Sequence, residues 1–94
     1  MDSDYSYSIH EKTILIIDLD KGGRSITNNM SNVLKDISFK EGIDLSFYNI
    51  AYKDSLNEWD GVKIGDNSKI SFYPIRKPDE KSVLEFFKSQ KIKK

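Results

Sequence analysis

The chain has 94 residues, 15 basic side chains against 15 acidic ones, and no cysteine. Such a length supports one compact core and excludes large enzymes built from several lobes. The missing cysteines exclude a disulfide framework and thiolate metal sites, and they agree with a cytoplasmic location. No run approaches the roughly 18 to 20 apolar residues of a membrane-spanning helix, and the N-terminus lacks the pattern of a signal peptide. We therefore expect a small soluble domain with no membrane partner.

Residues 1–11 alternate polar residues with Tyr5, Tyr7 and Ile9. The apolar positions are few and separated by serine, so we expect a mobile N-terminal arm. The alternative is an edge strand, because a period of two places these three side chains on one face. Residues 12–94 are expected to form a single α/β domain.

The segment Thr13–Leu19 is a nearly continuous apolar run, which predicts a central strand covered on both faces. A glycine pair ends this run, and Ser25 or Thr27 is placed to cap the helix that follows. Helical spacing predicts this helix from about 27 to 40, and Gly42 is expected to end it. Its apolar stripe consists of Ile26, Met30, Val33, Leu34 and Ile37.

The second half of the chain predicts a sheet and a closing helix. Short apolar segments separated by turns predict strands over about 46–53, 58–64 and 69–75. A helix is predicted over about 79–91, where Asp79 and Glu80 suit a helix N-terminus. The order strand, helix, three strands, helix belongs to the α/β (α+β) class, with a mixed sheet of about four strands and the second helix covering the face opposite the first. The predicted core contains Ile14, Ile16, Met30, Val33, Leu34, Ile37, Ile50, Phe72, Leu84 and Phe87.

Asp18 and Asp20 lie two residues apart at the end of the first strand, so both face one side at the edge where α/β sheets bind ligands. This strand end resembles the first motif of haloacid-dehalogenase-type phosphatases. The resemblance implies a nucleophilic Asp18, a general acid at Asp20 and magnesium nearby, and Gly65-Asp66 resembles the late acidic motif of that family. Lys21 stands where the family usually has glycine, and the late motif lacks its second acid. The alternative is structural, with both carboxylates ending a strand and capping a turn. No family is recognised across the whole chain.

The loop before the first predicted helix is a candidate anion site. Gly22, Gly23, Arg24 and Ser25 combine free backbone N–H groups, a helix N-terminus and a guanidinium, which together favour a phosphate or carboxylate. The neighbouring acidic pair repels anions, however, and the spacing matches neither the dinucleotide-binding motif nor the P-loop.

Other catalytic schemes lack the necessary residues. His10 is the one histidine, which excludes a histidine metal cluster and a well-held base for a Ser-His-Asp triad. We expect no metal site and no cofactor. Near the C-terminus, Lys88, Lys91, Lys93 and Lys94 suit the negative end of a helix dipole. Their alternative role is contact with nucleic acid, which the zero net charge disfavours.

Trp59 and Phe86 are the candidates for a protein contact. Trp59 lies beside a turn, and large aromatic residues are enriched at interfaces, with burial beneath the hairpin as the alternative. Phe86 and Phe87 cannot both occupy the centre of one helical stripe, because adjacent residues point about 100° apart. The remaining strand aromatics are interpreted as core packing rather than a stacking surface for RNA, because the basic residues near them are scattered. These are Tyr48, Tyr52, Phe72 and Tyr73.

By elimination, we expect a non-catalytic protein-interaction domain that regulates or inhibits a larger protein. Thirteen lysines against two arginines are typical of an AT-rich genome, as in a mobile element or phage. The expected partner is a protein, and the sequence leaves its identity and the oligomeric state open. Two alternatives remain: a magnesium-dependent phosphate-handling enzyme or anion-binding module at the Asp18, Asp20 and Gly22–Ser25 segment, and a nucleic-acid binder that uses the C-terminal lysines.

Overall fold

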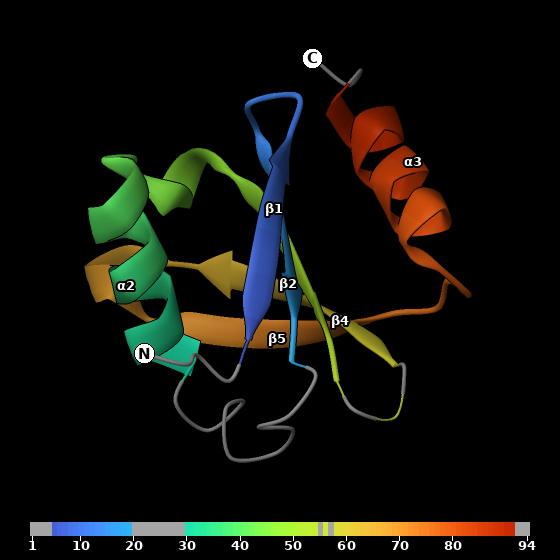
Figure 1. Ribbon diagram of the computed structural model, residues 1–94, viewed down its shortest axis with the longest axis horizontal. Coiled ribbons are helices and arrows are strands. Elements are labelled where there is room, and N and C mark those ends of the chain that lie inside the picture. The colour runs from blue at the N-terminus through green and yellow to red at the C-terminus, as the bar shows by residue number, and fades with distance from the viewer. Residues whose placement is uncertain (1–4, 20–29, 55, 57, 92–94) are drawn as a thin grey trace.

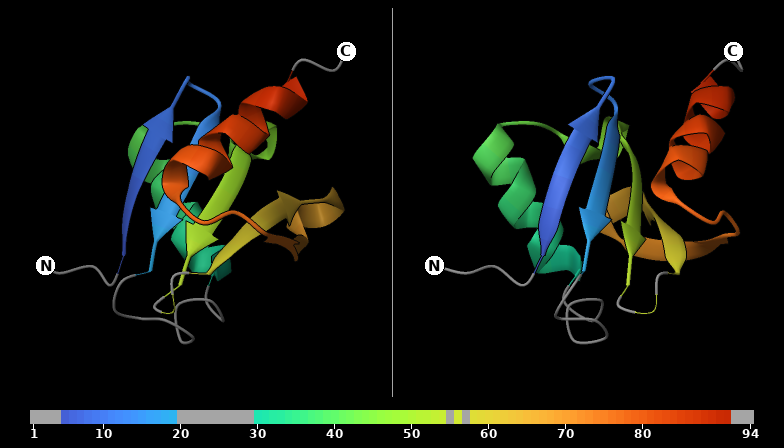
Figure 2. Two further views of the ribbon diagram at one scale, coloured as in Figure 1. Left: turned by 90° about the vertical axis from the view of Figure 1, so that its right-hand side faces the viewer. Right: turned by 45° about the vertical axis from the view of Figure 1, so that its right-hand side comes forward.

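In the residues that the structure describes, five strands form one mixed sheet and two helices lie on its opposite faces (Figure 1, Figure 2). This computed structural model describes residues 5–19, 30–54, 56 and 58–91, except for the side chains of residues 68, 90 and 91. The elements are β1 (Ser6–His10), β2 (Ile14–Asp18), α2 (Met30–Glu41), the 3-10 turn η1 (Leu45–Phe47), β3 (Asn49–Lys53), β4 (Trp59–Ile64), the 3-10 turn η2 (Asp66–Ser68), β5 (Ile70–Ile75) and α3 (Glu80–Lys91).

The strands follow one another across the sheet in the order β1-β2-β3-β4-β5. β2 and β3 are parallel and are connected through α2, whereas the other neighbouring strands are antiparallel. The predicted α/β class with a mixed sheet and two helices is therefore confirmed, with one strand more than predicted. Neither helix of the described residues is long and apolar enough to cross a membrane.

The additional strand is β1, which pairs with β2 along its whole length. This pairing corrects the prediction of a mobile arm over residues 1–11 and supports the edge-strand alternative, while residues 1–4 lie outside the described residues. Tyr5, Tyr7 and Ile9 pack on the α2 side of the sheet. The Tyr5 hydroxyl donates a hydrogen bond to Asp36, and the Tyr7 hydroxyl donates to Glu41 at 2.6 Å. Both acceptors belong to α2, so the tyrosines attach the edge strand to the helix.

These tyrosine contacts predict a loss of stability at alkaline pH. Burial and the hydrogen bond to Asp36 raise the pKa of Tyr5 to about 12, from 10.0 in an unfolded chain. The hydrogen bond to Glu41 raises the pKa of Tyr7 as well. The folded state therefore holds these protons more tightly, and the stabilisation is complete below pH 10 and lost as the pH rises from about 10 to about 12.

Urea unfolding measured at intervals from pH 9 to pH 12 is the test of this prediction. The Tyr5→Phe variant should show a smaller alkaline loss than the original protein, because it has no proton to release at that position. A residual loss is expected, since burial also raises the pKa of Tyr73. An equal alkaline loss in both proteins would contradict the role of Tyr5.

The sheet has a core on each face. On the α2 side, β2 and β3 bury Leu15, Ile17 and Ile50 against Leu34 and Ile37. The core on the α3 side contains Ile14, Ile16, Ala51, Trp59, Ile75, Val83 and Phe87. The apolar residues of β2 thus alternate between two covered faces, which is the reason for its nearly continuous apolar sequence.

The ends of the two helices have the expected chemistry. Gly42 follows α2 with a φ of +65°, and the N–H groups of Gly42 and Ile43 donate to the Ser38 carbonyl at 2.8 and 3.2 Å. Glycine adopts this left-handed conformation without a steric penalty, so it ends the helix as predicted. At α3, the Asp79 carboxylate accepts a hydrogen bond from the Ser82 N–H at 2.9 Å and caps the first turn.

Phe72 departs from the predicted core. Its ring contacts that of Tyr52 edge-on, with the centroids 5.9 Å apart, but the residue is 45% exposed. The reason is its position on β5, an outer strand with no neighbour beyond it in the described sheet. Leu84 is only partly buried and packs at the margin of the core on the α3 side.

Candidate functional site

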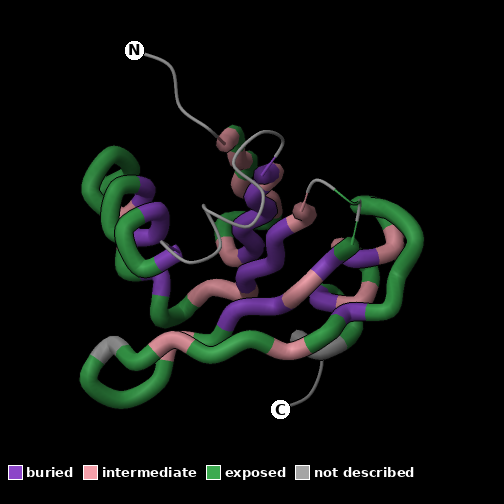
Figure 3. The backbone as a smooth tube through the Cα atoms, turned by 90° about the horizontal axis from the view of Figure 1, so that it is seen from below, coloured by how far each residue is buried: buried purple, intermediate pink, exposed green. Residues whose placement is uncertain are grey.

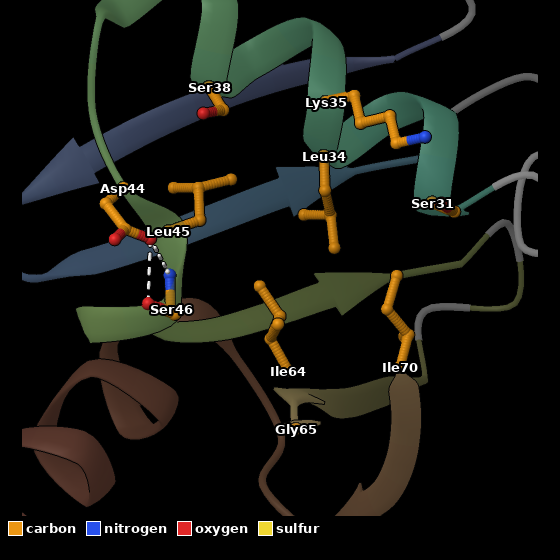
Figure 4. Close-up of a pocket in the computed structure, with 10 residues that line it drawn as sticks. All are labelled: Ser31, Leu34, Lys35, Ser38, Asp44, Leu45, Ser46, Ile64, Gly65 and Ile70. Carbon is orange, nitrogen blue, oxygen red and sulfur yellow. Dashed lines mark hydrogen bonds between the residues drawn. The ribbon is translucent and has the colours of Figure 1, made fainter. Parts of the chain in front are cut away.

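A pocket of about 290 Å³ lies between α2, η1 and the turn that joins β4 to β5 (Figure 4). Leu34 points into it from α2, and Ile64 and Ile70 line the opposite side. The remaining lining is largely polar and consists of Ser31, Lys35, Ser38, Asp44, Leu45, Ser46 and Gly65. The pocket therefore offers an apolar floor with hydroxyl and charged groups around it, an arrangement typical of binding sites.

Local hydrogen bonds hold the η1 side of this pocket in place. The Asp44 carboxylate accepts from the N–H of Ser46 at 3.0 Å and from its hydroxyl at 2.7 Å. These bonds, the one from the Ser46 side chain above all, lower the pKa of Asp44. The Ser38 hydroxyl donates to the Ile43 carbonyl at 2.6 Å and connects α2 to the same turn. Leu45, the first residue of η1, is buried, whereas its neighbours Asp44 and Ser46 are exposed.

Two exposed phenylalanines lie close in sequence to residues that line the pocket. Phe39 is 88% exposed and Phe47 is 80% exposed. Phe39 lies four residues after Lys35 and therefore on the same side of α2 as this pocket residue. Phe47 follows Ser46, which also lines the pocket. We call Phe39, Phe47 and the pocket between α2 and η1 the aromatic rim.

The sequence did not single out Phe39 or Phe47. The apolar stripe of α2 has positions 30, 33, 34 and 37, so Phe39 falls outside it, and this mismatch is the signal that would have found it. Phe47 lies in the segment predicted as a strand over about 46–53, and the sequence analysis assigned it no role. Phe47 instead ends the 3-10 turn η1, where its side chain is exposed.

Asp18 occupies a second pocket, of about 280 Å³, at the other end of the sheet near the start of α3. Its Oδ2 lies 3.6 Å from Lys53 Nζ, and its buried Oδ1 has no hydrogen-bond partner among the described residues. Asp79 and Glu80 also line this pocket, but Asp79 caps α3 and Glu80 Oε2 lies 3.4 Å from His10 Nε2. Each carboxylate of this pocket therefore has a lysine, histidine or backbone partner within the fold.

The residues of the phosphatase-like motif do not assemble into one described site. Asp18 pairs across the sheet with Lys53, which pairs with Trp59 at the start of β4, whereas Asp66 follows the end of β4. At about 3.3 Å per residue, the length of β4 alone separates the two acids by roughly 16 Å. Within residues 5–19, 30–54, 56 and 58–91, no group of three or more acidic or histidine side chains is placed to hold a metal ion.

Two of the other predicted sites lie largely outside the described residues. Asp20 and the anion-site candidates Gly22, Gly23, Arg24 and Ser25 belong to the segment 20–29, which the structure does not describe. Of the C-terminal lysines, Lys88 lies 3.5 Å from Glu11 Oε2 and joins α3 to the turn between β1 and β2. The side chain of Lys91 and residues 92–94 lie outside the description.

The two predicted contact residues differ in their exposure. Trp59 is only 6% exposed and belongs to the core under α3, which is the alternative that the sequence left open. Phe86 is half-buried, with its ring centroid 5.6 Å from that of Phe87 and the Lys77 ammonium 5.7 Å above it. Of the two, Phe86 alone presents substantial surface to a partner.

Comparison with known proteins does not place the chain in a family. No protein-family model matches it, and neither the curated proteins nor the solved structures return a match.

Proposed function

We propose that this chain is a non-catalytic protein-interaction domain that binds its partner through the aromatic rim. The observation that supports the proposal most is the pair of phenylalanines, 88% and 80% exposed, each within four residues of a residue that lines a pocket with an apolar floor. Neither ring contributes to the core, so their apolar surface is available to a partner. Aromatic anchors beside a pocket are the features that concentrate binding energy in protein interfaces.

The charges around the pocket favour a protein partner over a nucleic acid. Lys35 and Asp44 both line it, so the site has no excess of positive charge. Phosphate backbones are bound chiefly by clusters of lysine and arginine, which this site lacks. The fitting partner is a protein surface that presents an apolar side chain for the pocket and apolar contacts for the two rings. A small domain of this kind acts by occupying the surface of a larger protein, as a regulator or inhibitor does.

The proposal predicts a large loss of affinity when both rings are removed. The partner is first captured from the native host with the tagged chain, and its dissociation constant is then measured by isothermal titration calorimetry. The Phe39→Ser/Phe47→Ser variant should bind at least about thirtyfold more weakly, which corresponds to about 2 kcal/mol. Both side chains are exposed, so the free energy of unfolding should change by no more than about 0.5 kcal/mol.

Leu56→Ser is the matched control. Leu56 is 69% exposed and lies in the connection between β3 and β4, away from the aromatic rim. This variant removes another largely exposed apolar side chain and should keep the original affinity. Unchanged binding by the double variant, or an equal loss in the control, would overturn the assignment of the rim. A loss caused instead by Phe86→Ala would move the interface to α3.

A further inference from the structure

We infer that β5 pairs in antiparallel fashion with β5 of a second copy of this chain, so that two sheets join across a two-fold axis. β5 is the last strand of the described sheet, and its exposed side runs along one margin of the molecule (Figure 3). Its six residues, Ile-Ser-Phe-Tyr-Pro-Ile, include no charge. Proteins usually protect such an edge with charged side chains or proline, because its free N–H and C=O groups pair with other strands, and Pro74, near one end, is the single such residue of β5.

The hydrogen-bond pattern identifies which backbone groups of β5 face outward. The Gly65 N–H donates to the Lys69 carbonyl at 2.7 Å at the start of the β4–β5 ladder. In an antiparallel ladder, bonded and non-bonded pairs alternate, so residues 71, 73 and 75 bond to β4. Ile70, Phe72 and Pro74 therefore direct their backbone groups to the free edge. Pro74 has no N–H group. Because its backbone faces away from β4, the β4–β5 ladder does not need a hydrogen bond from it.

The outward backbone N–H and C=O groups of β5 match those of a second copy when a two-fold axis passes beside Phe72. With Phe72 opposite its counterpart, each Phe72 N–H meets the other Phe72 carbonyl. Each Ile70 N–H then meets the Pro74 carbonyl of the other copy. Every N–H group of the strand's free edge obtains an acceptor, and the missing N–H of Pro74 leaves only the Ile70 carbonyl without a partner. A register shifted by two residues also gives each outward N–H group an acceptor. It shortens the paired part of the two β5 strands to residues 70–72.

The side chains fit the same register. Phe72 is 45% exposed, and the pairing places it beside its counterpart on the α2 side of the joined sheets. Ile70, which is partly buried, comes to lie opposite Pro74 of the other copy. No residue of the strand carries a charge, so the pairing brings no like charges together. The surface that β5 exposes as a monomer is thus the surface that a second copy covers.

Sedimentation velocity of the full chain, from micromolar to millimolar concentration, tests the inference. We expect a weak, concentration-dependent dimer, since one strand pair is a small interface. Phe72→Lys places two like charges opposite each other and should raise the dissociation constant of the dimer at least about tenfold. Phe47→Lys introduces the same charge at the aromatic rim and should leave the dimer unchanged. A monomer at every concentration, or a dimer that persists in Phe72→Lys, would overturn the inference.

Amide hydrogen exchange provides a second measurement that does not depend on a variant. In the described sheet of the monomer, the Ile70 and Phe72 N–H groups point away from β4, whereas those of Ser71 and Tyr73 bond to it. Protection of Ile70 and Phe72 should therefore increase with protein concentration, while Ser71 and Tyr73 remain protected throughout. A dimer without this gain of protection has its interface elsewhere and would contradict the proposed pairing. The rim and the β5 edge share Ile70, whose side chain lines the pocket and whose backbone faces the second copy, so Phe47→Lys and Phe72→Lys, which alter one surface each, are the variants that separate the two proposals.

Discussion

Replacing Phe87 with alanine is expected to lower the free energy of unfolding by about 3 to 5 kcal/mol. Phe87 has no exposed surface and packs with Val83 against the α3 side of the sheet. Truncation removes most of its apolar side chain and leaves a cavity that its neighbours only partly fill. Since small domains are stable by about 5 to 15 kcal/mol in total, this loss would threaten the attachment of α3.

Phe86 is the matched control, because it is the same residue type at the next position of the same helix. It is half-buried and packs only at the margin of this core, so Phe86→Ala should cost no more than about 1 to 2 kcal/mol. Urea unfolding of the three proteins, followed by circular dichroism, gives the comparison. Equal losses in the two variants would show that the buried side of α3 is assigned incorrectly.

The strand and helix pattern could be predicted from the sequence where burial follows a local rule. The apolar run of β2 predicted cover on both faces, and α2 and α3 provide it. Gly42 and Asp79 marked helix ends through their own backbone chemistry. These features depend on residues close together in the chain, so a local sequence pattern is enough to predict them.

Features that depend on distant residues could not be predicted in this way. The hydrogen bonds that attach β1 to α2 run from Tyr5 and Tyr7 to residues 31 and 34 positions later. The sequence analysis included Phe72 in the core, but its exposure follows from the place of β5 at the edge of the sheet. The aromatic rim likewise requires α2 and η1 to meet the β4–β5 turn, which no single segment specifies.

Gly61 is expected to be the least replaceable glycine of the described sheet, because the ring of Tyr73 lies directly over it. A Cβ at this position would lie 2.0 Å from Tyr73 Cζ and 2.4 Å from both Cε atoms. Gly61→Ala must therefore displace the ring, and we expect it to cost about 1 to 3 kcal/mol of the free energy of unfolding. Gly65→Ala is the control, since its nearest atom is 3.6 Å away and its φ of −101° suits alanine.

A double-mutant cycle separates this steric effect from the backbone preference of glycine. In the Tyr73→Ala background the ring is absent, so the additional cost of Gly61→Ala should fall to about 0.5 kcal/mol or less. Chemical denaturation of the single and double variants gives the coupling between the two positions. If Gly61→Ala is equally costly with and without the ring, the demand for glycine comes from the backbone of β4. If the cost depends on the ring, then Tyr73 covers the part of the sheet that the glycine leaves open, and the pair fixes the register between β4 and β5.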